Sequence, residues 1–145
     1  MKKHLTILTV LFSSLFILAV QAYSHCEIPC GIYDDEMRMA MIEEHAATIE
    51  KSMNEIVELE KGGNANQLVR WITNKENHAT ELQHIVTQYF MTQRIKFDAE
   101  HYDKKLAALH KMLVYAMKCK QTTDTANVDM LRQAAEEFHQ LYFHQ

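Results

Sequence analysis

The sequence has little glycine, proline or cysteine, with three, one and three of them in 145 residues. Tight turns between strands need glycine or proline, so this scarcity argues against a sheet protein and against a disordered linker. Three cysteines are too few for the disulfide framework of a small secreted domain. Lys and Arg number 15 against 19 Asp and Glu, so we expect no basic surface for nucleic acid.

The remaining composition favours helices, because 48% of the residues are hydrophobic and nine are methionine. Helical spacing runs from Asp34 to Lys61, where Gly62 and Gly63 stop it, and begins again near Asn64 or Asn66. A third stretch covers about 98–121, and a fourth follows residues 122–125. We therefore predict an all-α fold, an antiparallel four-helix bundle over residues 34–145, as a single domain.

Apolar residues in each stretch recur every three or four positions, the spacing of one packed helix face. No punctuating residue marks the end of the second helix, around residues 92–97. We expect the core to contain Met39, Ile42, Ala46, Ile49, Met53 and Ile56, then Leu68, Ile72, Ala79, Leu82, Val86 and Tyr89, then Tyr102, Leu106, Leu109, Leu113 and Met117, and finally Val128, Leu131, Ala135, Phe138 and Tyr142.

Residues 1–24 have the layout of a secretory signal peptide that is cleaved. Two lysines precede an apolar run over residues 5–20, and Ala22 and Ser24 are small residues at the −3 and −1 positions of a cleavage site. An uncleaved anchor is the alternative, but this run spans only about 24 Å of a hydrocarbon core about 30 Å thick. We expect an exported protein, periplasmic or secreted, with no membrane contact after cleavage. Its 121 residues would begin at His25 and carry a net charge of −6.

The first nine residues after that cut read HCEIPCGIY, and we call residues 25–33 the hook. Pro29 restricts the residue before it to extended conformations, and Gly31 permits a left-handed turn. The hook can therefore fold back on itself and bring the sulfurs of Cys26 and Cys30 together.

His25, Cys26 and Cys30 would offer a metal ion a planar set of donors. The amine of His25 and the amide nitrogen of Cys26 close one five-membered chelate ring, and that nitrogen closes a second with the Cys26 sulfur. Cys30 can complete the plane, and the His25 imidazole can reach an axial position. A planar field with a deprotonated amide suits Ni(II) or Cu(II), whereas zinc prefers a tetrahedron. Anionic donors also stabilise Ni(III).

The pattern H-C-x-x-P-C-G-x-Y at a processed N-terminus resembles the hook of nickel-containing superoxide dismutases. The resemblance continues into residues 70–79, with Lys75 and Glu76. It implies a four-helix subunit, assembled as a homohexamer, with one nickel ion per subunit. The implied reaction is disproportionation of superoxide to dioxygen and hydrogen peroxide by Ni(III)/Ni(II) cycling.

By this resemblance, the nickel ligands are His25, Cys26 and Cys30, with the His25 imidazole axial in the oxidised state. Tyr33 would stand over the open axial face, where it limits access and orders water. Family members hold the axial imidazole with a carboxylate and an arginine. Arg70 fits the arginine by its place before Lys75 and Glu76. The two protons that peroxide needs would come from water, from Tyr33 or from groups beside the thiolates.

The carboxylate of that arrangement has no clear counterpart. An ungapped count from the hook reaches Met41, and Glu43 or Glu44 would require a shift. Glu27 stands where the family often has aspartate, a mild change if the position contributes mainly its backbone N–H. Because the net charge repels superoxide, Lys and Arg near the hook would have to attract it.

Two other interpretations remain for the hook. On spacing alone, Cys26 and Cys30 of an exported protein could form a disulfide in a structural helical protein, although the rest of the nine-residue pattern favours nickel. The alternative function is a non-catalytic exported bundle that binds nickel or copper at the same donors.

The remaining metal-binding residue types are expected to be structural. Cys119 is interpreted as a buried small hydrophobe. The pairs Glu81/His84 and Glu136/His139 have the spacing of di-iron bundles, but one member of each lies about 200° from its apolar seam, which indicates surface pairs. The methionines at 37, 39 and 41 do not share a face. Residues His45, His78, His101, His110 and His144 show no common ligand spacing.

Overall fold

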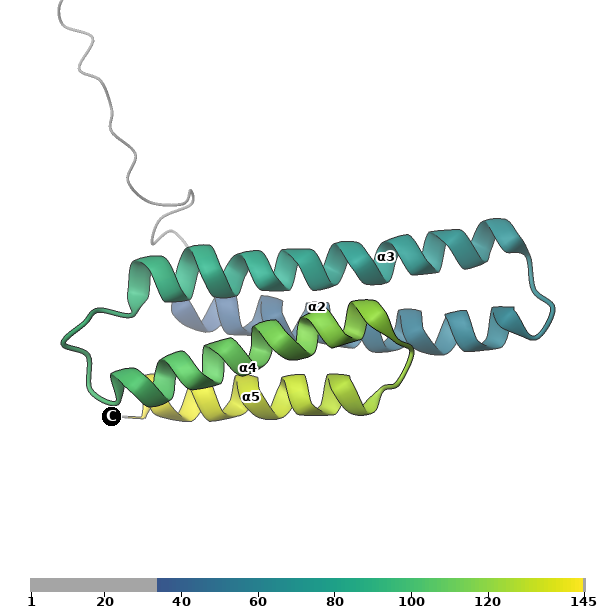
Figure 1. The fold of residues 1–145 in the computed structure, drawn as a ribbon. Helices are drawn as coiled ribbons and strands as arrows, with labels where there is room; N and C mark the ends of the chain where they lie inside the picture. The colour runs from purple at the N-terminus through teal and green to yellow at the C-terminus, as the bar shows by residue number, and fades with distance from the viewer. Residues whose placement is uncertain (1–33, 145) are drawn as a thin grey trace, which may run out of the picture.

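The computed structural model describes residues 34–144, and every regular element in that range is helical (Figure 1). The helices are α2 (Asp35–Glu60), α3 (Ala65–His84), its direct continuation η1 (Ile85–Arg94), α4 (Tyr102–Gln121) and α5 (Ala126–Phe143). The prediction of an all-α bundle of four helices is therefore confirmed. None of the helices within residues 34–144 is long and apolar enough to span a membrane.

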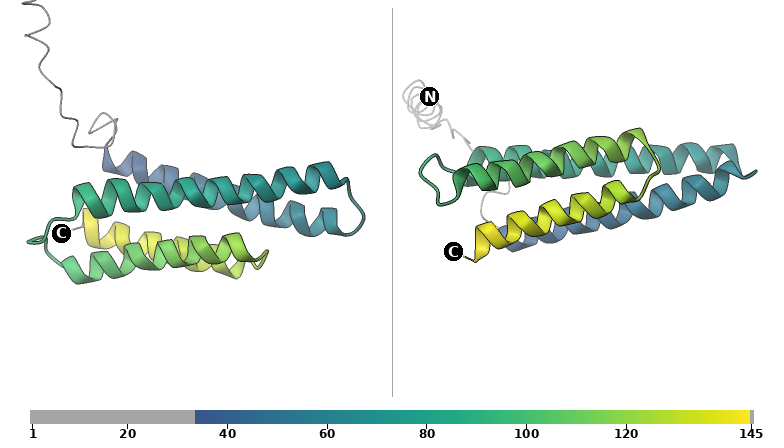
Figure 2. Two further views of the ribbon diagram at one scale, coloured as in Figure 1. Left: turned by 45° about the horizontal axis from the view of Figure 1, so that its top comes forward. Right: turned by 60° about the horizontal axis from the view of Figure 1, so that its bottom comes forward.

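The helices form a ring in which each packs against its neighbours in the chain, and α5 closes the ring against α2. The α2–α3 hairpin is longer than the α4–α5 hairpin and extends past it at the end where α2 turns into α3 (Figures 1 and 2). Val57, Val69 and Ile72 lie on this overhang and are exposed. At the other end, the start of α2 lies beside the end of α5 and the end of η1.

The predicted helix boundaries between α2 and α3 are confirmed, with their caps. The Asp34 carboxylate accepts a hydrogen bond from the backbone N–H of Met37, three residues into the helix. After α2 the chain turns at Gly62, whose φ of 126° is accessible to glycine. Asn64 then caps α3 by accepting from the backbone N–H of Asn66.

The predicted core is largely correct, and it is wrong at two positions. All six residues expected on α2 are buried, as are Val128, Leu131, Ala135 and Phe138 on α5. Ile72 is 40% exposed because the first half of α3 belongs to the overhang. Met117 is also exposed, since the buried line of α4 runs instead through Ala108, Met112, Ala116 and Cys119.

The connection between η1 and α4 departs from the prediction in its details. The third helix was expected from about residue 98, but α4 begins at Tyr102, because His101 adopts φ 54° and interrupts the helical backbone. Before it, η1 is a π-helix, in which hydrogen bonds reach back five residues, as from the N–H of Ile95 to the carbonyl of Phe90 at 3.0 Å.

Candidate metal centre and the bundle end next to it

The predicted ligands His25, Cys26 and Cys30, the access residue Tyr33, and the signal peptide all lie outside the described residues. The chain enters the described part at Asp34, so the start of α2 is the part of the bundle next to the hook. The environment of this helix start therefore decides what the bundle can contribute to a metal centre.

Asp35, in the first turn of α2, is the centre of a polar cluster that joins three elements. Its Oδ1 accepts hydrogen bonds from the hydroxyl of Tyr89 and from Nε of Arg94 at 2.8 Å, and its Oδ2 accepts from the hydroxyl of Tyr142 at 2.7 Å. We call these four residues the Asp35 cluster. It fixes the first turn of α2 to the end of η1 and the end of α5.

The electrostatics of the Asp35 cluster favour an ionised carboxylate. Burial alone would raise the pKa of Asp35, but the hydrogen bonds from Tyr89, Tyr142 and Arg94 outweigh it and lower the pKa. Burial and the same carboxylate raise the pKa of both tyrosines, which therefore stay protonated as donors. The cluster is a fixed set of donors around one anion.

Two more cations lie at this end of the bundle. The guanidinium carbon of Arg38 lies 4.7 Å from the centre of the Tyr89 ring, and Nζ of Lys105 lies 5.7 Å from the centre of the Tyr142 ring. Arg38 is 8% exposed and Lys105 is 1% exposed. Together with Arg94, these cations stand against three acids at the start of α2, Asp34, Asp35 and Glu36, so this end of the bundle carries both signs of charge.

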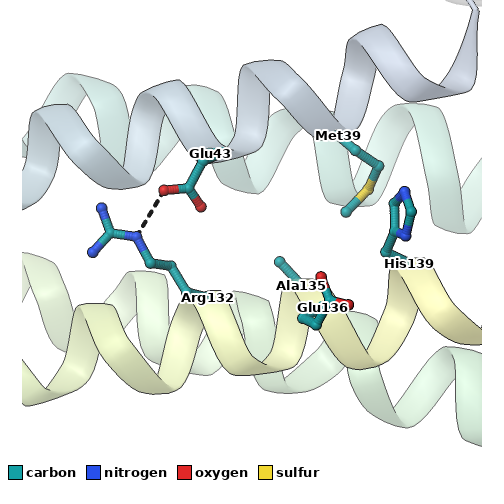
Figure 3. Close-up of a pocket in the computed structure, with 6 residues that line it drawn as sticks. All are labelled: Met39, Glu43, Arg132, Ala135, Glu136 and His139. Atoms are coloured by element: carbon teal, nitrogen blue, oxygen red, sulfur yellow. Dashed lines mark hydrogen bonds and ion pairs between the residues drawn. The ribbon is translucent and has the colours of Figure 1, made fainter.

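Glu43, one of the two carboxylates that only a shifted alignment would reach, already has a partner. Figure 3 shows Glu43 on α2 facing Arg132 on α5, and Oε1 lies 2.7 Å from Nε of the arginine. The pocket around them has a volume of about 190 Å³, and Met39 and His139 line it at the end nearer the start of α2. Glu44 is exposed, and Met41 packs against the core.

Arg70 lies at the other end of the bundle. It is exposed on the second turn of α3, and Asn74, one turn later, donates a hydrogen bond to Ser52 of α2 at 3.0 Å. Ser52 is 17 residues beyond Asp35, or about 25 Å along the helix axis. Arg70 therefore lies far along the bundle from the start of α2, and its assignment to the metal centre stays a prediction.

The bundle offers no competing metal site in residues 34–144, where no group of three or more His, Cys, Asp or Glu could hold an ion. Cys119 is fully buried, as predicted, and burial raises the pKa of its thiol to about 11, so it is not a thiolate at neutral pH. Both Glu-x-x-His pairs are surface pairs, as predicted, and His139 binds Glu36 at 3.0 Å. Met37 is exposed and Met39 is buried, so these neighbours do not share a face, as predicted.

Sequence analysis missed one histidine pair. Nδ1 of His45 on α2 lies 2.9 Å from Nδ1 of His78 on α3, and the two rings pack edge to face. Burial and then the charge of His78 lower the pKa of His45, against a smaller opposite effect from Glu81 and Glu44. His101, His110 and His144 are exposed.

These observations define a class: a four-helix bundle whose own described side chains hold no metal, with its candidate ligands on the segment that precedes the first helix. A sequence profile of nickel-containing superoxide dismutases matches residues 19–145, and the chain belongs to this family. No curated protein sequence and no solved structure matches the chain significantly. The family establishes an oxidoreductase that uses nickel to convert superoxide into dioxygen and hydrogen peroxide, and it does not favour the non-catalytic alternative.

Proposed function

We propose that nickel is bound at a processed N-terminus by His25, Cys26 and Cys30. The amine and imidazole of His25, the amide nitrogen and thiolate of Cys26 and the thiolate of Cys30 would hold the ion. The single observation that carries this proposal is that the family match includes the whole hook, while residues 34–144 contain no alternative cluster of ligands.

The donor chemistry fits nickel in a redox role. Nickel, when bound, supplies a one-electron couple between Ni(II) and Ni(III), and the two thiolates and the deprotonated amide favour the higher oxidation state. One superoxide loses an electron and leaves as dioxygen, and a second gains one, takes up two protons and leaves as hydrogen peroxide. Tyr33 would limit access to the open axial face and order water there.

The bundle would hold this site at the end where α2 begins. Cys30 lies four positions before Asp34, a path of at most about 14 Å. Arg38, Arg94 and Lys105 are among the cations at this end, and they would oppose the repulsion of superoxide by the net negative charge.

Export and assembly complete the proposal. Cleavage after Ser24 in a periplasmic or secreted protein would free the amine of His25, on which the ligand plane depends. Assembly into a homohexamer follows from the family resemblance, and the apolar overhang of Val57, Val69 and Ile72 would suit contact between copies. In such an assembly Arg70 of a neighbouring subunit could approach the hook.

Replacement of each cysteine tests the ligand assignment. We expect Cys26→Ser and Cys30→Ser in the mature protein to lose stoichiometric nickel and dismutase activity, because a thiolate ligand is removed. Cys119→Ala is the matched control and should keep both, at a stability cost of about 1 kcal/mol. Nickel content measured by elemental analysis would contradict the assignment if the hook variants kept full nickel and Cys119→Ala lost it.

A further inference from the structure

Two histidines from different helices place their ring nitrogens in contact. Nδ1 of His45 on α2 lies 2.9 Å from Nδ1 of His78 on α3, and the ring centres are 5.0 Å apart. Both side chains are half-buried. The residues that follow them, Ala46 and Ala79, are buried in the core. Core packing therefore fixes the two stretches of backbone that carry the histidines.

The separation of these nitrogens is that of two ligands on one metal ion. A bond from zinc to imidazole is about 2.0 to 2.1 Å long, so two nitrogens bound at about 90 to 110° lie about 2.9 to 3.4 Å apart. In the neutral pair, one ring donates its Nδ1 proton to the other ring. When that proton moves to Nε2 of its own ring, both Nδ1 atoms present a lone pair, which is the form of imidazole that binds a metal.

The charged groups around the pair favour a bound cation. Glu44 directly precedes His45, and Glu81 follows His78 by three residues, about one turn of α3. Both carboxylates are exposed, and both act on His45 in the direction that favours positive charge. Burial and the neighbouring ring act more strongly in the other direction and lower the pKa of His45. The site thus offers neutral ligands beside two negative charges.

We propose that His45 and His78 form a second metal site, which takes a divalent ion that prefers imidazole, such as Zn(II), Ni(II) or Cu(II). Residues 34–144 contain no group of three or more His, Cys, Asp or Glu that could hold an ion, so this pair binds with water in the remaining positions. It releases its ion more readily than a closed site of four protein ligands. Its ligands come from α2 and α3, so it does not depend on what the hook binds.

Zinc titration of the metal-free mature protein, followed by calorimetry, tests the site. The hook donors can also bind zinc, so the informative quantity is the difference between chains that carry the same hook. We expect His45→Gln and His78→Gln each to weaken the binding of one zinc ion per chain by about tenfold or more, because a single imidazole remains. His78→Asp supplies a carboxylate ligand in place of the imidazole and should restore part of the binding.

His110→Gln is the matched control, since His110 is an exposed histidine of α4, and it should leave zinc binding unchanged. Helicity measured by circular dichroism verifies the fold of each variant. A second measurement needs no variant: histidines of the unaltered protein are acylated with and without zinc and located by mass spectrometry. Zinc should protect His45 and His78 and leave His110 reactive.

Equal zinc binding in the unaltered protein and in both glutamine variants would overturn the site. A loss confined to one variant would also overturn it, because the ion would then have only one of the two histidines as a ligand. Acylation of His45 and His78 that zinc does not slow would do the same. The proposed nickel ligands are tested separately, by the nickel content of the Cys26 and Cys30 variants.

Discussion

At the scale of single residues, the bundle end beside the hook is organised by charge. Asp35 accepts three side-chain hydrogen bonds from two other elements, and Arg38 lies next to the same tyrosine without a carboxylate of its own. The carboxylate of Asp35 therefore has its hydrogen-bond donors, whereas Nε of Arg38 has no hydrogen-bond partner within the described bundle. The three hydrogen bonds to its carboxylate give the Asp35 cluster a structural role, because they fix the start of α2 to η1 and α5.

Asp35→Asn should destabilise the protein by about 2 kcal/mol, because hydrogen bonds to a charged acceptor are lost in a partly buried site. Since the pKa of Asp35 is lowered in the folded state, its stabilising contribution is present above the unfolded value of about 4 and is lost as the pH falls through the folded value. Urea unfolding at pH 7 measures the change. Asp103→Asn, at an exposed position of α4, is the control, and equal loss in both would count against the cluster.

The His45–His78 pair should make stability fall with pH in the same direction as Asp35 does, although here the folded state favours the neutral form of the group. The folded state lowers the pKa of His45 and so favours its neutral form. The stability that this provides is fully present above the unfolded pKa of about 6.5, and it is lost as the pH falls through the lower folded value. Burial, His78, Glu81 and Glu44 set the size of the shift.

Unfolding free energies at pH 7.5 and 5.5 check this. We expect the wild-type protein to lose more stability than His45→Gln over that interval, by up to about 1 kcal/mol, because a half-buried pair is partly screened. His110→Gln, at an exposed position of α4, should follow the wild type. An identical pH dependence in His45→Gln would show that the pair does not titrate as described.

At the scale of elements, capping residues and apolar spacing predicted where the helices lie, but they did not predict the irregular backbone of η1. Asp34, Gly62 and Asn64 marked the ends of α2 and α3, because each satisfies a specific demand of a helix terminus. Tyr89 and Arg94 are five residues apart, a spacing that has no meaning on an α-helix. The π-helix η1 brings both side chains to the carboxylate of Asp35. No residue type in the sequence predicts a π-helix at this place.

Lys75 shows another contact that the sequence did not reveal. The family resemblance drew attention to it beside Glu76, whereas the structure buries it to 4% exposure between α3 and the end of α4. Its Nζ donates hydrogen bonds to the carbonyls of Lys120 at 2.7 Å and Thr122 at 3.1 Å. It thus satisfies carbonyls at the C-terminus of α4 from a neighbouring helix.

Lys75→Met should cost about 2 to 3 kcal/mol of unfolding free energy, because these carbonyls lose a charged donor in a buried place. Thermal or urea unfolding measures the loss. Lys61→Met is the matched control, since Lys61 forms an exposed pair with Glu58 and should change stability by less than about 0.5 kcal/mol. A loss no larger than the control's would contradict the capping role.

At the scale of the whole molecule, the fold was predictable and the position of the site relative to it was only partly so. Scarce glycine and proline with helical spacing sufficed for four helices. The spacing of residues in the sequence could not show that Arg70 lies about 30 Å from the start of α2, because helix lengths and the direction of α3 decide that distance. Arg38 and Arg94 lie near the start of α2, and no motif or spacing in the sequence predicts that position.

The molecule divides its tasks between two parts. The bundle supplies an end tied together by the Asp35 cluster, and the short segment before it would supply all the metal ligands. If the first of those ligands is the terminal amine of His25, as proposed, the activity would depend on one peptide bond being cut. Adding a single residue therefore changes the metal site without changing any side chain.

The most direct measurement is dismutase activity and nickel content of the mature protein with one alanine added before His25, compared with the unextended protein. The extension replaces the terminal amine by an amide, so we expect a loss of activity of about 100-fold or more and loss of the Ni(III) electron-spin signal, with helicity unchanged. Undiminished activity in the extended protein would contradict the account.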